Sequence, residues 1–157
     1  MRRSIGVVVL LAAAVAVISL VSSAVADEGN GDRVLRSQLI GSTPPAQGGP
    51  TLFGVTPAGA PWVVAASDVD ARRNGRIEVK VEGLVIPGRG TAGIPAVTAS
   101  LYCGGELVGT TAPAPLSTEG DAEIRDTIAE APDQCLAPTV FVSPDGRPLT
   151  YFAVTGA

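Results

Sequence analysis

Apolar and charged residues alternate without interruption over residues 76–82. In an extended strand successive side chains point to opposite faces, so three aliphatic residues share one face and four charged residues share the other. The aliphatic residues are Ile77, Val79 and Val81, and the charged residues are Arg76, Glu78, Lys80 and Glu82. An Asn-Gly pair at 74–75 predicts a tight turn before this run. We expect a half-buried strand whose charges at i and i+2 pair weakly.

Short runs rich in Val, Ile and Thr recur along the chain, with Pro and Gly separating them roughly every ten residues. We expect further strands at residues 34–40, 62–66, 97–103, 106–111, 121–128, 139–142 and 149–154. Residues 52–55 predict a short extended piece, and residues 84–86 extend the run at 76–82. A short helix is the alternative for residues 121–128, which contain Glu and Arg. Short strands without a long helical period predict an all-β fold, an antiparallel immunoglobulin-like β-sandwich of about seven to nine strands.

Segments rich in Pro and Gly mark the loops between these strands. Residues 41–50 form a Pro/Gly-rich loop, because Pro44 and Pro45 cannot donate the hydrogen bonds of a central strand. Residues 88–95 indicate a second loop, and Ser-Pro-Asp-Gly-Arg-Pro at 143–148 indicates a hairpin turn. Trp62, the only tryptophan, is expected in the core, with exposed ligand stacking as the alternative.

The first 26 residues have the three-part pattern of a signal peptide. Arg2 and Arg3 precede an apolar run of 17 residues, and Ala24 and Ala26 are the small residues that a signal peptidase accepts. We expect cleavage before Asp27. A retained membrane anchor is the alternative, although the run is shorter than the ~20 residues that span a bilayer. Cleavage would leave one secreted or envelope-associated domain, residues 27–157.

The expected mature chain is acidic. Loss of the two signal arginines leaves nine Lys and Arg against 15 Asp and Glu, so the net charge changes from −4 to −6. Such a domain repels phosphate backbones and anionic lipids, so we expect no nucleic-acid partner, and membrane contact only through the signal segment of the precursor. The absence of histidine excludes Ser-His-Asp and Cys-His catalysis and histidine-based metal sites, and we expect no cofactor.

Cys103 and Cys135 are the only two cysteines. In an exported chain such a pair is expected to form a disulfide, and closing a loop of this length, 135 minus 103 or 32 positions, stabilises a fold by roughly 3–4 kcal/mol. A redox pair or a metal site is the alternative. The cysteines form no C-x-x-C motif, and two thiolates are too few to enclose a metal ion, so a structural disulfide is favoured.

Two aspartates before the Asn-Gly turn, Asp68 and Asp70, are candidates for a calcium site. The EF-hand pattern fails, because Arg72 and Arg73 occupy its fifth and sixth positions, where an oxygen ligand and glycine are needed. An irregular calcium site remains as one interpretation. Solvated turn carboxylates are the other.

Two pairs of acids could serve as the carboxylates of a glycoside hydrolase. They are Glu78 with Glu82, and Asp121 with Glu123. This chemistry needs two carboxylates that face one sugar across a cleft. Carboxylates on one solvent-facing strand are more often solubilising charge, so these pairs weakly support catalysis.

Three arginines, Arg72, Arg73 and Arg76, cluster at the tip of the predicted hairpin. They form a candidate interaction patch for an acidic polymer or an acidic protein. The alternative is a solvated turn, because three charges on a flexible tip bind weakly in physiological salt.

Five segments carry a family resemblance, residues 60–64, 74–76, 79–87, 99–105 and 135–138. They resemble small secreted proteins of actinobacteria, a group without an assigned activity. The Val-Glu-Gly-Leu that ends the hairpin resembles secreted β domains of the CHRD type, although the histidines often found in those domains are missing here. The resemblance implies secretion and gives no catalytic residues.

Together these patterns favour a non-enzymatic extracellular or envelope-associated β domain, with a binding or structural role. Its expected partners are an envelope component or another secreted protein. The alternatives are a hydrolase that works by carboxylates alone and a calcium-stabilised structural module.

Overall fold

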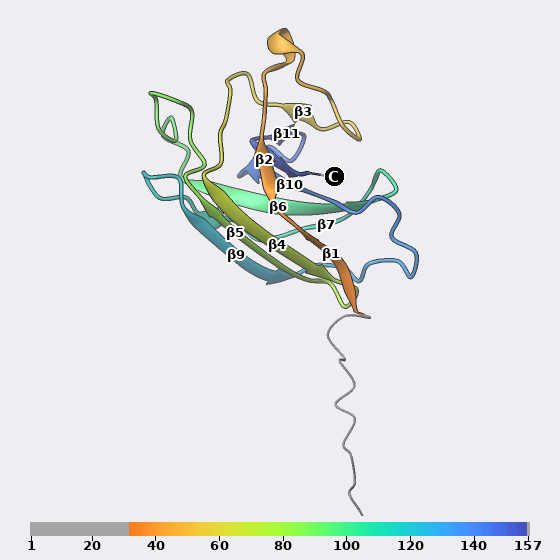
Figure 1. The fold of residues 1–157 in the computed structure, drawn as a ribbon. Coiled ribbons are helices and arrows are strands. Elements are labelled where there is room, and N and C mark those ends of the chain that lie inside the picture. The colour runs from red at the N-terminus through yellow and green to blue at the C-terminus, as the bar shows by residue number, and fades with distance from the viewer. Residues whose placement is uncertain (1–31, 157) are drawn as a thin grey trace, which may run out of the picture.

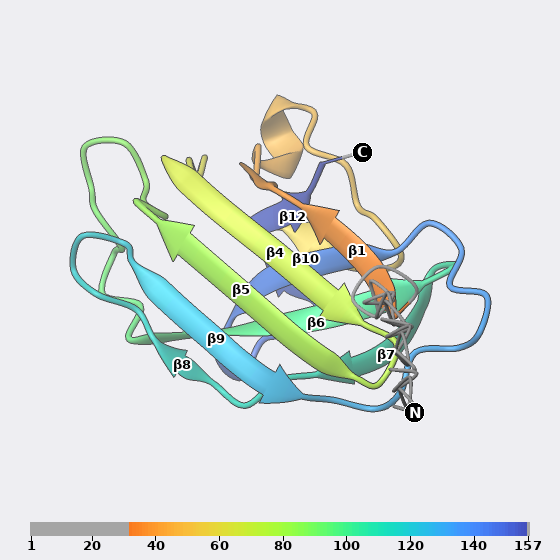
Figure 2. The same ribbon diagram turned by 60° about the horizontal axis from the view of Figure 1, so that its bottom comes forward.

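The computed structural model describes residues 32–156, and these residues form two antiparallel sheets packed face to face (Figure 1). The first, sheet A, has the strand order β1-β4-β5-β9. Its strands are β1 (Arg33–Ser37), β4 (Ala66–Arg72), β5 (Arg76–Glu82) and β9 (Ala122–Thr127). Figure 2 shows these four strands side by side across one face of the molecule.

The second, sheet B, has the order β2-β12-β10-β6-β7, and β8 also pairs with β6. Its strands are β2 (Leu39–Gly41), β12 (Ala153–Thr155), β10 (Thr139–Pro144), β6 (Ala96–Cys103), β7 (Glu106–Thr110) and β8 (Ala114–Pro115). Only Gln38 separates β1 from β2, so one segment of the chain passes from sheet A to sheet B. A separate parallel pair joins β3 (Thr56–Pro57) to β11 (Thr150–Tyr151).

The main core lies between the inward faces of the two sheets. Ile77, Val79 and Val81 of β5 are at most 1% exposed, which confirms the alternation predicted for this strand. Trp62 is 4% exposed and its ring stacks on Phe152, with the ring centroids 3.9 Å apart. The prediction that Trp62 belongs to the core is therefore confirmed, as is the antiparallel sandwich.

Residues 42–57, here called the cover, lie over the outer side of sheet B (Figure 1). The cover contains a 3-10 turn, η1 (Pro45–Gln47), and the strand β3. Val55 of the cover packs with Tyr102, Phe141 and Tyr151 in a second apolar cluster. The Tyr151 hydroxyl donates a hydrogen bond of 2.8 Å to the Pro50 carbonyl, which fastens the cover to the cluster.

The central strand β4 is absent from the sequence prediction. We expected a strand at 62–66 followed by turn carboxylates, whereas the strand is Ala66–Arg72 and pairs with both β1 and β5. Val69 and Ala71 are fully buried, and Asp68 and Asp70 alternate with them on the outer side. The prediction was wrong because aspartates are also common in turns, so the outward-facing aspartates of this strand were assigned to a turn.

Other predicted boundaries also change. Residues 52–55 form a tight turn closed by Leu52 and Val55. Residues 62–65 and 84–86 form isolated bridges in place of strands, one between Val63 and Val85 and one between Ile86 and Gly90. The strand expected at 121–128 is present as β9, so the helical alternative is wrong. Within residues 32–156 there are 12 strands, more than the expected seven to nine, because several are only two or three residues long.

The predicted signal peptide and its cleavage site at Ala24, Ala26 and Asp27 lie outside the described residues. Within residues 32–156, no helix has the length and apolarity that a membrane crossing requires.

Candidate functional site

The outer side of sheet A carries twelve charged residues, which we call the charged face. They are Arg33, Arg36, Asp68, Asp70, Arg72, Arg76, Glu78, Lys80, Glu82, Asp121, Glu123 and Arg125. Six are positive and six are negative. The described residues hold nine Lys and Arg, the 11 of the chain less Arg2 and Arg3, so two thirds of these cations lie on one face. This concentration makes the charged face the candidate functional site.

Strand register brings these charges together. Asp70 lies opposite Glu78, and Glu78 lies opposite Arg125 on the next strand. The turn between β4 and β5 fixes this register, because Gly75 takes the positive φ of 85° that three-residue hairpin loops need. The Asn74 side-chain oxygen accepts a hydrogen bond of 3.1 Å from the backbone N–H of Arg76. The predicted Asn-Gly turn is confirmed.

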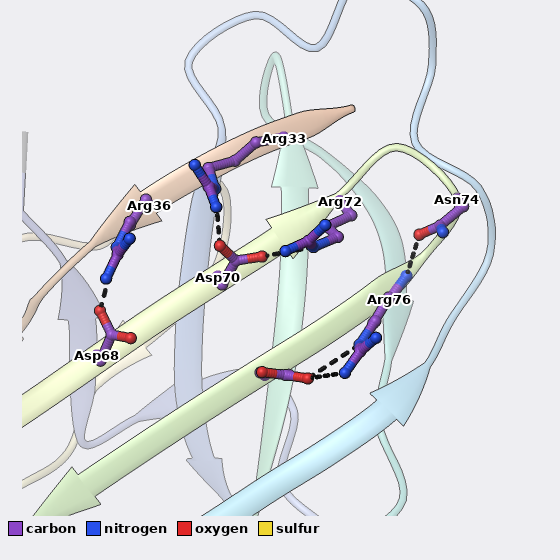
Figure 3. A network of polar contacts seen from close by, with 8 residues as sticks. Arg33, Arg36, Asp68, Asp70, Arg72, Asn74 and Arg76 are labelled. Atoms are coloured by element: carbon purple, nitrogen blue, oxygen red, sulfur yellow. Dashed lines mark hydrogen bonds and ion pairs between the residues drawn. The ribbon is translucent and has the colours of Figure 1, made fainter. Parts of the chain in front are cut away.

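Asp70 forms the most buried ion pairs of the charged face (Figure 3). Its side chain is 15% exposed, and its two oxygens accept hydrogen bonds from Arg33 Nε at 2.7 Å and Arg72 Nε at 3.0 Å. Burial alone would raise the pKa of the Asp70 carboxyl. The two guanidinium groups outweigh burial and hold this pKa below its ordinary value, so Asp70 is a charged bridge between β1 and β4.

Four further carboxylates of the charged face are paired closer to solvent. The pairs are Arg36–Asp68 at 3.7 Å, Arg76–Glu78, Lys80–Glu82 at 2.7 Å and Arg125–Glu123 at 2.5 Å. Three of these pairs join positions i and i+2 of one strand, as predicted for the charged side of β5. The hydrogen bond from Lys80 to the Glu82 carboxylate raises the pKa of the Lys80 ammonium.

An open hollow of about 140 Å³ lies on the charged face. Asp68, Glu78 and Glu123 line it together with Lys80 and Arg125. A carboxyl that acts as a general acid must retain its proton near neutral pH, which requires an apolar surrounding. Val79 and Ile124 also line the hollow, but each of its carboxylates faces water and forms an ion pair, so no carboxyl there has the apolar surrounding of a general acid.

The two aspartates considered for calcium do not converge on one point. The nearest partner of Asp68 is Arg36, and Asp70 is held between Arg33 and Arg72 (Figure 3). Both aspartates lie on a strand, so the interpretation as turn carboxylates is wrong. Among residues 32–156 no group of three or more Asp, Glu, His and Cys side chains is arranged to hold a metal ion.

The two acid pairs considered for hydrolysis are each bound within the charged face. Glu78 pairs with Arg76, and Glu82 pairs with Lys80. The Asp121 carboxylate accepts a hydrogen bond of 2.9 Å from the backbone N–H of Gly83, and Glu123 is paired with an arginine of its own strand. The carboxylates of each pair thus bind other groups and not each other.

The three arginines of the predicted patch have separate partners inside the chain. Arg72 binds Asp70, and Arg76 binds Glu78. The Arg73 guanidinium donates hydrogen bonds to the Asp133 carbonyl at 2.5 Å and the Pro132 carbonyl at 3.4 Å. Arg73 thus holds the loop after β9 against the hairpin, and only part of each guanidinium faces solvent.

Cys103 and Cys135 form the predicted disulfide. Cys103 ends β6 in sheet B, whereas Cys135 lies in the loop that follows β9 of sheet A. The Leu136 carbonyl accepts a hydrogen bond of 2.5 Å from the backbone N–H of Gly104 beside this bridge. The disulfide therefore anchors the loop between β9 and β10 to the end of β6, close to where β10 pairs with β6, and both cysteines serve the fold.

A second exposed surface, which sequence reasoning missed, surrounds Phe53 at the tip of the cover. Phe53 is 44% exposed and stacks on Tyr102, with ring centroids 6.0 Å apart. Its φ of 51° lies in the left-handed region, which few aromatic residues occupy. Gly105 has no side chain to collide with the Phe53 ring lying above it. The sequence signal for this turn is weak: two residues, Phe53 and Gly54, separate the apolar residues Leu52 and Val55.

Comparison of the chain with protein-family models, curated proteins and solved structures finds no match. The resemblance to secreted actinobacterial proteins and to CHRD-type domains therefore stays a prediction. What the chain does has to be inferred from its own geometry.

Proposed function

We propose that this protein is an exported, non-enzymatic β domain that binds a component of the cell envelope or another secreted protein. The observation that carries the proposal is the charged face, where two thirds of the described cations gather on an otherwise acidic domain. Exposed charges in a fixed pattern steer and orient a partner more than they stabilise a fold. A binding role accounts for such a pattern better than a role in folding.

The geometry gives little support to the alternative, a hydrolase that works by carboxylates alone. Both candidate acid pairs are engaged by cations or by a backbone amide on an open sheet. Glycoside hydrolysis needs one carboxyl that keeps its proton and a second that faces it across a bound sugar. The charged face offers neither an apolar site for the first nor a deep cleft for the sugar.

Export agrees with the chemistry of the described residues. The disulfide between Cys103 and Cys135 persists in an oxidising compartment, whereas cytosolic reductants keep most thiols reduced. The predicted signal peptide supplies the route. Mass spectrometry of the protein recovered from culture medium tests this directly: the expected amino terminus is Asp27. Full-length chain confined to the membrane fraction would instead support the retained anchor.

A pull-down tests the binding proposal. The bait is the chain from residue 27 to 157, which contains both sheets, and it is exposed to cell-wall fractions and to secreted proteins. The matched control replaces Arg76, Glu78, Lys80 and Glu82 with Gln, which removes two ion pairs without changing the net charge. We expect a ligand retained by the native face and lost from the control.

Two results would count against the proposal. Equal retention by bait and control would remove the charged face from the binding site. No retention above that of an unrelated acidic β-sandwich would remove the basis for a binding role. Circular dichroism of the control verifies that it keeps the strand content of the native domain.

A further inference from the structure

The two ends of the charged face differ in charge. The half next to the β4–β5 turn carries five arginines and two acids, a net charge of +3. These residues, the basic half, are Arg33, Arg36, Asp70, Arg72, Arg76, Glu78 and Arg125. The other half carries one lysine and four acids, a net charge of −3. These residues, the acidic half, are Asp68, Lys80, Glu82, Asp121 and Glu123.

We propose that the charged face binds the charged face of a second copy of this chain. The two sheets would lie face to face with their strands antiparallel, so that each basic half covers the acidic half of the other copy. A two-fold axis between the halves makes both contacts at once, as an isologous dimer requires. The inference rests on the proposed function in taking the charged face as the binding surface, and it names the partner.

The antiparallel arrangement keeps like charges apart. Strand β5, whose outward residues are all charged, runs from Arg76 to Glu82, six steps of about 3.3 Å, so the charged face is roughly 20 Å long and each half is roughly 10 Å long. Electrostatic interactions in water are screened over about 10 Å at 0.1 M salt. At this salt the charges directly opposite a half therefore dominate its interactions, and repulsion between like halves is avoided because each half faces the opposite one.

A second copy fits this face better than a polymer of one charge does. The face as a whole is neutral, so a polyanion is attracted by the basic half and repelled by the acidic half to the same extent. A polycation is likewise attracted by the acidic half and repelled by the basic half. Only a surface with both signs in the opposite order satisfies both halves, and the chain itself carries such a surface.

The contact must be weak and sensitive to salt. Stable interfaces bury an apolar centre, whereas the outward positions of β4, β5 and β9 that form this face are charged or polar, apart from Ala66 at the start of β4. The pairs already made within each chain remain hydrated, so the gain comes from charge complementarity between copies. We expect the dissociation constant to rise at least tenfold between about 20 mM and about 500 mM salt.

Charge-swap variants of residues 27–157 test the arrangement by sedimentation velocity at low salt. The first variant, Arg36→Glu with Arg76→Glu, turns the basic half acidic. The second, Glu82→Lys with Glu123→Lys, turns the acidic half basic. These positions are solvent-facing, and the half-buried Asp70 bridge is left intact. We expect the native chain to dimerise, each variant alone to be monomeric, and an equimolar mixture of the two to dimerise again.

Restored association in the mixture requires two complementary halves and also shows that both variants are folded. A native chain that stays monomeric at every concentration and salt would overturn the inference. So would variants that associate as strongly as the native chain. The pull-down is read separately: retention of an envelope ligand by a strictly monomeric chain would leave the proposed function standing and refute the self-pairing alone.

Discussion

The outer faces of the two sheets differ in exposure: that of sheet A is open to solvent, and that of sheet B is covered. On sheet A, β5 alternates buried aliphatic residues with exposed charges, and the outward side chains pair with one another. On sheet B, seven of the eight residues of β6 are buried, because the core lies on one side of the strand and the cover on the other. One face is left open to water and carries the charges, while the other is closed by a segment of the same chain.

This difference separates the part of the molecule that stabilises it from the part available for recognition. Burial of large side chains contributes several kcal/mol each, whereas exposed ion pairs contribute about 0–1 kcal/mol. Changes beneath the cover should therefore act on stability, and changes on the charged face should act on binding. The following substitutions test this division, because each has an expected effect on the free energy of unfolding that depends on which face it changes.

The largest expected effect is that of Phe141→Ala beneath the cover. Phe141 is fully buried, and its ring packs edge-on against Tyr102 at 5.2 Å and lies 5.3 Å from the ring of Tyr151. Removing it leaves a cavity, so we expect the free energy of unfolding to fall by about 3–5 kcal/mol. Urea unfolding followed by the fluorescence of Trp62 measures the change. Leu107→Ala, at an exposed position of β7, is the control and should cost no more than about 0.5 kcal/mol.

Replacing both cysteines with alanine should cost slightly less. The bridge from Cys103 to Cys135 spans 32 positions and joins the end of β6 to the loop after β9. The chain-entropy model gives a loss of roughly 3–4 kcal/mol in the free energy of unfolding. Reduction of the native chain with dithiothreitol should lower the melting temperature as much as the double substitution does. A double variant that melts at the native temperature would show that the disulfide does not stabilise the attachment of the β9–β10 loop to the end of β6.

The same contrast explains which features the sequence could predict. Strand β5 was predictable because one of its faces is solvated, so its period of two is visible. Strand β4 was not, because Asp68 and Asp70 lie four and two residues before the Arg72-Arg73-Asn74-Gly75 run, and together these polar residues look like one turn. Buried and charged residues do alternate along β4, but its position as a central strand becomes clear only from its pairing with β1 and β5.

The sequence predicted which residue types could form a site, but it did not predict which of these residues lie together in the fold. The calcium, hydrolase and arginine hypotheses each used pairs or triplets of residues close in sequence, whereas the charged face gathers residues from four strands. Arg33 and Arg125 are distant in sequence from the β4–β5 turn and join the face only through strand pairing. The cover was equally hidden, because nothing in residues 42–57 indicates which sheet they lie on.

Asp70→Asn should have an intermediate effect that depends on pH. The carboxylate is charged in the fold with a lowered pKa, so its contribution is present above the ordinary pKa near 3.8 and is lost as pH falls through the folded value. We expect a loss of about 1.5 kcal/mol at pH 7, the low end for hydrogen bonds to a charged group. Unfolding curves from pH 7 to pH 2 should converge for the variant and the native chain at the acidic end. Asp145→Asn, in an exposed turn, is the matched control, and an equal loss there would refute the role of the Asp70 bridge.

The smallest expected effect is the coupling between Arg76 and Glu78 on the open part of the charged face. Their side chains are 58% and 36% exposed, so solvent competes for both partners. A double-mutant cycle with Arg76→Gln and Glu78→Gln should give a coupling energy of about 0.5 kcal/mol or less, and salt near 1 M should abolish it because the screening length falls to about 3 Å. A cycle on Arg33 and Asp70, which are half-buried, should give a larger and less salt-sensitive value. If the exposed pair proved the stronger, the charged face would be part of what holds the sandwich together, and its concentration of arginines would need no binding partner to explain it.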